Sequence, residues 1–207
     1  QRWHGRNLMK NYLFKLGVQA KKVSNKTIKS KKKDQVLKDY CNLLFKNQLK
    51  IISENKKDLK KAKEKKLKEN LINRLKIDHK KILQIINSTK TIIKFKDPVG
   101  QILERWKRPN GLNIKKITIP IGVVAVIYES RPNVTSDVAS LCFKSGNPVI
   151  MKGGSEAYYS NKIFTNLFRK ALKKNKINKN YVQFIDYKNR KVVDFLLTRM
   201  TNYIDLI

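Results

Sequence analysis

The sequence predicts an α/β fold in which a helical amino-terminal region and a β-hairpin precede a parallel sheet. Apolar residues recur at helical spacing from residue 11 to about residue 93. An Asn-Gly pair, Asn110–Gly111, separates two segments rich in strand-forming residues. After Pro120, short β-branched runs alternate with helical segments, which is the pattern of parallel strands joined by crossover helices.

Length and composition narrow the class of protein. A chain of 207 residues with 41% hydrophobic and 30% charged residues can bury a core, so a disordered chain is excluded. Its apolar runs, such as Ile119–Ile127, are shorter than the roughly 18 residues of a membrane-spanning helix. Two cysteines form no disulfide framework and favour a reducing, cytoplasmic setting. His4 and His79 stand alone, so no metal site is predicted.

The formal net charge of +33 first suggests a partner such as nucleic acid. Lysine outnumbers arginine 39 to 9, however, whereas proteins that recognise phosphates and base edges favour arginine. Segment 121–160, the richest in motifs, holds three basic and three acidic residues. We therefore interpret the lysines as covering solvated helix faces and expect no specific nucleic acid partner. A basic nucleic-acid-binding protein with an α/β scaffold remains the alternative.

Residues 9–95 are predicted to form the helical amino-terminal region. Ser53 is expected to cap a helix that runs through Leu67, and Asp78 to cap the next one. The preceding residues 1–8 are interpreted as an upstream or non-native extension, because the chain opens with Gln1 and its first methionine is Met9.

Residues 96–119 are predicted to form the hairpin, with strands at 101–107 and 112–119. Lys115 and Lys116 interrupt the alternation of polar and apolar residues, so one face is expected to be an exposed or oligomer-facing edge.

Residues 120–207 are predicted to form a partial dinucleotide-binding α/β domain. The continuous apolar run at 122–128 is typical of a strand buried on both faces, and Gly146 fits the end of the helix that follows it. Because the chain stops inside the last expected strand, this domain is predicted to be truncated. The further strands are expected at 148–152, 181–185 and 203–207, and the helices at 135–144, about 155–174 and about 191–200.

Ligands of open parallel sheets bind beyond the carboxyl ends of the strands. At one such end, Lys152 precedes Gly153, Gly154 and Ser155. A cation, two small residues and the free N–H groups of the next helix suit a phosphate or a ribose. The alternative is a tight strand-to-helix turn with a solvated lysine.

At the other end, Asn133 follows Pro132 where a helix begins, so its amide can donate to a developing oxyanion. Alternatively, Asn133 or Thr135 caps that helix. Cys41 and Cys142 are interpreted as core thiols, because no base stands near either one in the sequence.

Three strings in this region, YESRPNVTSDVASLC (Tyr128–Cys142), SGN (Ser145–Asn147) and KGG (Lys152–Gly154), occur together. In this combination the chain resembles the gamma-glutamyl phosphate reductase (glutamate-5-semialdehyde dehydrogenase) family of the aldehyde dehydrogenase superfamily. The resemblance extends from DPVGQ at Asp97–Gln101 to YIDLI at Tyr203–Ile207, and NLINRL at Asn70–Leu75 is compatible with it. It implies a sheet of the aldehyde dehydrogenase type.

The resemblance further implies an NADPH-dependent reduction of L-glutamate 5-phosphate to L-glutamate 5-semialdehyde and phosphate, a step of proline biosynthesis, by a cytoplasmic homo-oligomer. Asn133 would hold the oxyanion, and the charge of Arg131 suits the acyl phosphate. The family's catalytic cysteine would lie beyond Ile207, so the chain is expected to be the amino-terminal half of an enzyme and inactive alone. The residues expected to bind the cofactor are Tyr128, Lys152, Gly153, Gly154 and Ser155. Among them, the resemblance implies that Lys152 with its glycine turn faces the adenosine ribose or its 2′-phosphate.

Overall fold

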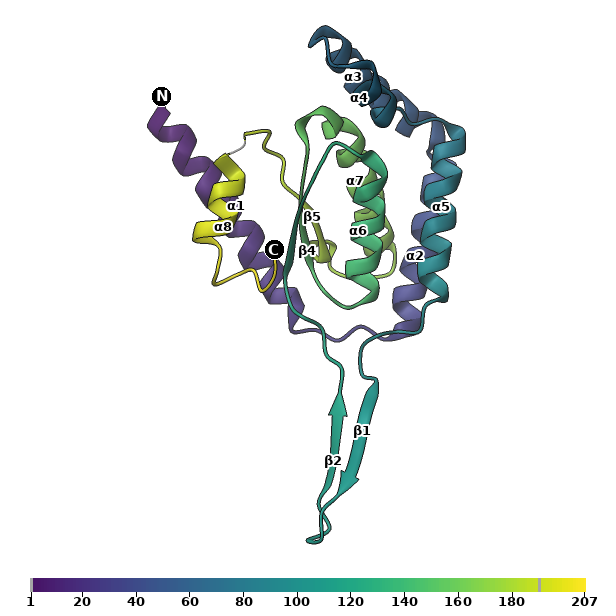
Figure 1. Cartoon of the computed structure of the whole chain (residues 1–207), viewed down its shortest axis with the longest axis vertical. Coiled ribbons are helices and arrows are strands. Elements are labelled where there is room, and N and C mark those ends of the chain that lie inside the picture. The colour runs from purple at the N-terminus through teal and green to yellow at the C-terminus, as the bar shows by residue number, and fades with distance from the viewer. Residues whose placement is uncertain (1, 190) are drawn as a thin grey trace.

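The computed structural model describes residues 2–189 and 191–207 and arranges them in layers around a small parallel sheet (Figure 1). The helices are α1 (Arg2–Ser24), α2 (Ser30–Lys46), α3 (Gln48–Glu64), α4 (Glu69–Leu75), α5 (His79–Lys94), α6 (Pro132–Lys144), α7 (Tyr158–Lys174) and α8 (Lys191–Arg199). The strands are β1 (Ile102–Lys107), β2 (Asn113–Ile117), β3 (Val124–Tyr128), β4 (Val149–Gly153) and β5 (Val182–Phe184), and two short 3-10 turns are η1 (Ser155–Ala157) and η2 (Lys179–Tyr181). Within the described ranges, no helix is long and apolar enough to cross a membrane.

The parallel sheet has the order β3-β4-β5, which confirms the predicted α/β class. Leu206 pairs with Val124 on the free side of β3, so the chain returns across the sheet after β5. The connections through α6 and α7 pack on one face of the sheet, while α8 and α1 pack on the other (Figure 1). The direction of winding therefore reverses beside β3, and such a reversal is where open α/β sheets bind ligands.

The predicted strand at 203–207 is wrong, since Leu206 makes only an isolated bridge there. The carboxylate of Asp205 accepts a hydrogen bond from the backbone N–H of Val123 at 2.7 Å, next to the backbone bonds that join this segment to β3. This side-chain contact holds the segment against β3 without extending the ladder.

Alternate residues of β4 enter two hydrophobic cores, as expected for a central parallel strand. Val149 and Met151 belong to the core under α6 and α7, while Ile150 belongs to the core under α1 and α8. In β3 only the amino-terminal half is enclosed, because Ala125 is 1% exposed but Ile127 is 39% exposed. The expectation of a strand buried on both faces therefore fails where β3 emerges at the carboxyl edge of the sheet.

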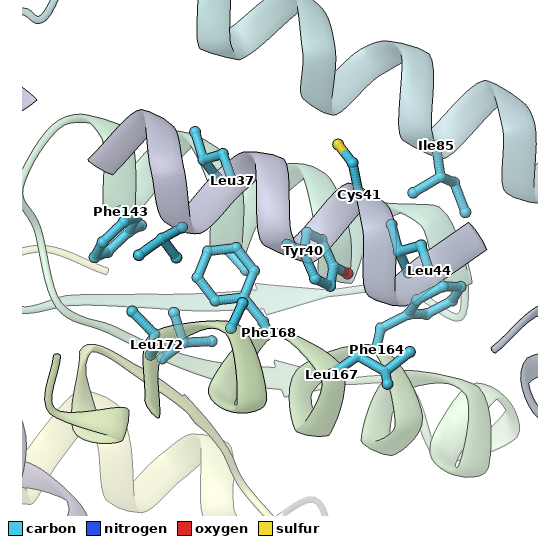
Figure 2. Packing of buried hydrophobic residues seen from close by; sticks show 14 of the residues in the cluster. Leu37, Tyr40, Cys41, Leu44, Ile85, Phe143, Phe164, Leu167, Phe168 and Leu172 are labelled. Atoms are coloured by element: carbon cyan, nitrogen blue, oxygen red, sulfur yellow. The ribbon is translucent and has the colours of Figure 1, made fainter. Parts of the chain in front are cut away.

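Helices α2, α3 and α5 form an outer layer over α6 and α7. Figure 2 shows Tyr40 of α2 against Phe168 of α7, with ring centroids 4.7 Å apart. The Tyr40 hydroxyl also shares a hydrogen bond with Ser136 Oγ of α6. The helical region and the α/β region thus share one continuous core.

Of the two helix caps predicted for this layer, the structure contains one. Asp78 caps α5, with its carboxylate accepting from the N–H of Lys81 at 2.8 Å, as predicted. Ser53 is not a cap, because α3 begins at Gln48 and includes it. The helix starts earlier since Ile51, which is fully buried, needs that first turn to face the core.

The predicted hairpin is confirmed. Strands β1 and β2 pair antiparallel, with Trp106 opposite Ile114, and Gly111 adopts the positive φ of 88° that the turn requires. The hairpin projects away from the rest of the molecule (Figure 1), and every residue of β1 is exposed.

Two buried lysines join the layers through ion pairs. Lys33 Nζ, on a residue 1% exposed, lies 2.9 Å from the carboxylate of Asp97 and donates to the carbonyl of Lys144. Lys144 Nζ in turn pairs with Asp34 at 2.5 Å and donates to the carbonyl of Ile93. Each ammonium enclosed in this layer therefore has a carboxylate partner.

Replacing Asp97 by alanine should lower the free energy of unfolding by about 3 kcal/mol, because it leaves the buried Lys33 ammonium without its carboxylate. Urea unfolding of the 207-residue chain, followed by circular dichroism, measures this loss. The matched control is Glu104→Ala, which breaks the exposed pair with Lys116 and should cost less than about 1 kcal/mol. Equal losses in the two variants would contradict the role given to the buried pair.

Candidate functional site

The candidate site lies at the carboxyl edge of the sheet, where β3 and β4 end side by side. Tyr128 is paired with Gly153 in the parallel register. The Tyr128 hydroxyl hydrogen bonds to Thr135 Oγ1 at 2.6 Å, and Thr135 donates to Asn161 Oδ1 at 2.8 Å. Burial raises the pKa of Tyr128, so the phenol stays protonated. Tyr128, Thr135 and Asn161 therefore form a chain of hydrogen bonds at the base of the site.

Close packing explains both glycines of the turn after β4. A Cβ on Gly153 would lie 2.2 Å from Asn161 Nδ2, and a Cβ on Gly154 would lie 2.0 Å from Ser130 Oγ. The turn after β3 thus rests directly on the turn after β4. The two turns form one continuous surface at the edge of the sheet.

The amino terminus of α7 is occupied from within the protein. Asp58 of α3 accepts hydrogen bonds from the N–H groups of Tyr159 at 3.0 Å and Ser160 at 2.8 Å, and from Ser160 Oγ at 2.7 Å. Burial raises the pKa of Asp58 despite these bonds. The expectation of free N–H groups for a phosphate is therefore wrong at these two positions, because an internal carboxylate fills them.

Lys152 differs from the other buried lysines. It is 7% exposed, and its Nζ donates to the carbonyl of Gly153 at 2.9 Å, but no carboxylate lies within ion-pair distance among the described residues. Burial lowers its pKa, partly offset by the charge of Glu156. An ammonium has three donors, so Lys152 keeps N–H groups available at the strand end.

Ser155 and Glu156 follow the turn after β4 and are hydrogen bonded to each other. The Glu156 carboxylate accepts from Ser130 Oγ at 2.6 Å and from Ser155 Oγ at 2.8 Å. Burial would raise the pKa of Glu156, but these hydrogen bonds outweigh it and lower the pKa. Both carboxylate oxygens are thereby directed toward the turn.

Neither side chain predicted as a cap of α6 has that role. The helix begins at Pro132, one residue after its N-cap Arg131, and no side chain caps it. The Asn133 amide donates weakly to Asp137 at 3.4 Å, while the Thr135 hydroxyl is hydrogen bonded to the hydroxyl of Tyr128. Proline at the first helical position sets the backbone without a cap.

A cleft of about 370 Å³ separates α4 from the two turns. Arg131 lines it, with its Nε 3.9 Å from Glu129, and Arg74 of α4 lines it as well. The place of Arg74 in the cleft could not be expected from the sequence, since nothing in its local pattern distinguishes it from a solvated helix residue. The remaining lining residues are Leu67, Leu71, Leu75, Glu129, Ser130, Gly154 and Glu156.

The cysteines stand apart from this cleft. Cys41 is a buried residue of α2 (Figure 2). Its Sγ lies 3.8 Å from the carbonyl of Ile86. Cys142 packs at the edge of the core that contains Cys41. Burial raises the pKa of each thiol to about 11, which disfavours the thiolate. Among the described residues, no group of three metal-ligating side chains lies together.

Comparison with solved structures places this fold in a known class. An acetylating aldehyde dehydrogenase from Geobacillus thermoglucosidasius matches with a TM-score of 0.69 at 14% identity, covering 93% of this chain and 40% of that one. The crystal structure of gamma-glutamyl phosphate reductase from Thermotoga maritima matches with a TM-score of 0.89 at 34% identity, covering 93% of this chain and 47% of that one. The fold is therefore that of the aldehyde dehydrogenases.

The sequence comparisons are more specific. The gamma-glutamyl phosphate reductase of Nautilia profundicola is 45% identical over 181 residues, which are 87% of this chain and 44% of the relative. That of Dictyoglomus thermophilum is 42% identical over 179 residues, which are 86% of this chain and 43% of the relative. No protein-family model matches the chain. The chain is a homologue of the gamma-glutamyl phosphate reductases and spans about half the length of these relatives.

Substituting alanine for Gly153 should lower the free energy of unfolding by about 1–3 kcal/mol, because the new Cβ overlaps the fully buried Asn161 amide. In the background of Asn161→Ala the same substitution should cost clearly less, since the overlapping group is gone. Urea unfolding of the two single variants and the double variant measures the coupling. Strictly additive losses would show that packing does not require this glycine.

Proposed function

We propose that the chain is part of an enzyme that reduces L-glutamate 5-phosphate to L-glutamate 5-semialdehyde, with release of phosphate and with NADPH as reductant. One structural observation carries this proposal beyond homology. Lys152 is a buried cation without a carboxylate partner among the described residues, at the strand end next to the reversal of winding. An enclosed ammonium with unused donors is costly unless a ligand completes its shell.

The residues at the sheet edge suit the adenosine half of a dinucleotide. Lys152 has N–H donors for the ribose, and Gly153 with Gly154 lets the turn pack closely against Asn161 and Ser130. Ser155 and Tyr128 orient this surface through Glu156 and Thr135. When bound, NADPH supplies the hydride, and the protein's part is to hold and orient it.

The cleft beside α4 suits the anionic substrate. Arg131 and Arg74 both line it, and guanidinium groups match the geometry of phosphate oxygens. Asn133 follows in the first turn of α6, where its amide is available to an oxyanion once it leaves Asp137. We assign Arg131 and Arg74 to the acyl phosphate and Asn133 to the developing negative charge.

We also propose that the complete enzyme is a cytoplasmic homo-oligomer and that the hairpin contributes to its assembly. Trp106 is 41% exposed and Ile117 is 53% exposed, on strands that project away from the core. Exposed apolar groups on a projecting hairpin are typical of an interaction surface.

The 207-residue chain alone should show no reductase activity. Burial raises the pKa of both of its thiols to about 11, and neither thiol lines the cleft that Arg131 and Arg74 line. A purified sample is mixed with NADPH and L-glutamate 5-phosphate, and the NADPH absorbance is followed. Sustained turnover that survives repeated purification would overturn the assignment of the nucleophile to a segment outside this sequence.

The variant Lys152→Met should weaken binding of NADPH and of NADH by about ten- to a hundredfold, since a charged hydrogen bond to the ribose contributes about 1.5–3 kcal/mol. Titration calorimetry of the 207-residue chain measures both affinities. Because burial lowers the pKa of Lys152, the same variant should keep its free energy of unfolding.

Lys170→Met, on the exposed side of α7, is the matched control and should leave both affinities unchanged. Unchanged affinities in Lys152→Met as well would exclude Lys152 from the cofactor site.

A further inference from the structure

A second, smaller cavity of about 150 Å³ adjoins the turn after β4. Ser155, one of the residues proposed to bind the cofactor, lines it together with Glu156. Lys61 and Lys65 of α3 and Lys188, which follows β5, line the rest together with Asp58 and Ala62. Three ammonium groups from two distant parts of the sequence thus converge beside one turn.

Two tyrosines hold two of these lysines. Lys61 Nζ donates to the Tyr159 hydroxyl at 2.8 Å and lies 4.7 Å from its ring centroid. Lys188 Nζ lies 4.3 Å from the ring centroid of Tyr158 and 5.4 Å from that of Tyr159. Aromatic faces orient a cation without neutralising it.

The nearby lysines also lower the pKa of the Tyr159 hydroxyl. The hydrogen bond from Lys61 lowers the pKa of Tyr159, and the charges of Lys61 and Lys188 lower it further. Within the described part of the chain, neither Lys61, Lys65 nor Lys188 makes an ion pair.

The two carboxylates of the cavity are hydrogen bonded within the protein, and the charges of Lys188 and Lys65 act on Asp58 and Glu156 respectively. Asp58 accepts from the amino terminus of α7, and Glu156 accepts from Ser130 and Ser155 with its two oxygens. In dinucleotide-binding folds an acidic residue that contacts the ribose 2′-hydroxyl favours NAD, whereas nearby cations accommodate a 2′-phosphate. Here Glu156 is held by Ser130 and Ser155, and the three lysines of the cavity outnumber its two carboxylates.

We infer that the cavity lined by Lys61, Lys65 and Lys188 binds the 2′-phosphate of the adenosine ribose and sets the preference for NADPH over NADH. This inference rests on the proposed function, because it assigns one phosphate of the proposed cofactor. Lys152 then contacts the ribose, which the two cofactors share, while the three lysines contact the group that distinguishes them. The helical amino-terminal region thereby supplies residues to the cofactor site.

The test uses the 207-residue chain and two small probes, adenosine 2′,5′-bisphosphate and adenosine 5′-monophosphate. Titration calorimetry should show that the bisphosphate binds at least tenfold more tightly than the monophosphate. Each of Lys61→Gln and Lys188→Gln should weaken the bisphosphate by about tenfold and leave the monophosphate unchanged, because each removes one charge-assisted hydrogen bond to the 2′-phosphate.

Lys63→Gln is the matched control, since it removes the same charge from an exposed position of α3 that does not line the cavity. Circular dichroism confirms that each variant remains folded. Selective loss in the two cavity variants with no change in Lys63→Gln supports the inference.

The possible failures are distinguishable. Equal affinity of the wild-type chain for both probes overturns the inference and leaves the ribose site in place. An equal loss in Lys63→Gln also overturns it, because the effect would then be that of general charge. Binding of neither probe overturns the proposed cofactor site together with the inference.

Discussion

The parallel register that sets Tyr128 beside Gly153 is the constraint on which the site depends. It makes both strands end at the same level, so the turns that follow them meet. Because Gly154 packs directly against Ser130, the contact leaves no room for a side chain between the turns. The same contact brings Ser130 to the carboxylate of Glu156. Packing thus explains why the turn contains glycine.

The outer helices complete this edge. Asn55 of α3 donates to the carbonyl at the end of α4 at 2.7 Å and to Ser160 Oγ at 3.0 Å, and Asp58 binds the first turn of α7. Since α4 forms one wall of the larger cleft and α3 carries lysines of the smaller cavity, these buried polar contacts position both. An internal carboxylate also takes the helix terminus that could otherwise bind an anion, so side chains must supply the positive charge.

Local patterns in the sequence predicted the elements better than their contacts. The β-branched run, the Asn-Gly turn, the Asp78 cap and the Gly146 stop are each specified within a few residues, and the structure contains them. The contact between Asp58 and α7 joins residues 102 positions apart, which no local pattern encodes. One observation was available, because Asn55 and Asp58 lie at helical spacing between the buried Ile51 and Ala62. Polar residues on a buried stripe require buried partners. Here Asn55 finds them at the end of α4 and on Ser160, and Asp58 finds them in the first turn of α7.

The chain has so many lysines that a cluster of them does not by itself identify a functional site. With a formal net charge of +33, a surface cluster of lysines is expected almost anywhere, and salt screens exposed charges over about 10 Å. Structural and functional lysines are instead distinguished by their burial and by whether a carboxylate pairs with them. Lys33 and Lys144 are enclosed with carboxylates and stabilise the fold, whereas Lys152 is enclosed without one. Lys61 and Lys188 are held on tyrosine rings, which fixes their direction and keeps their charge. The cations that a ligand can complete are therefore those that the fold positions but does not neutralise.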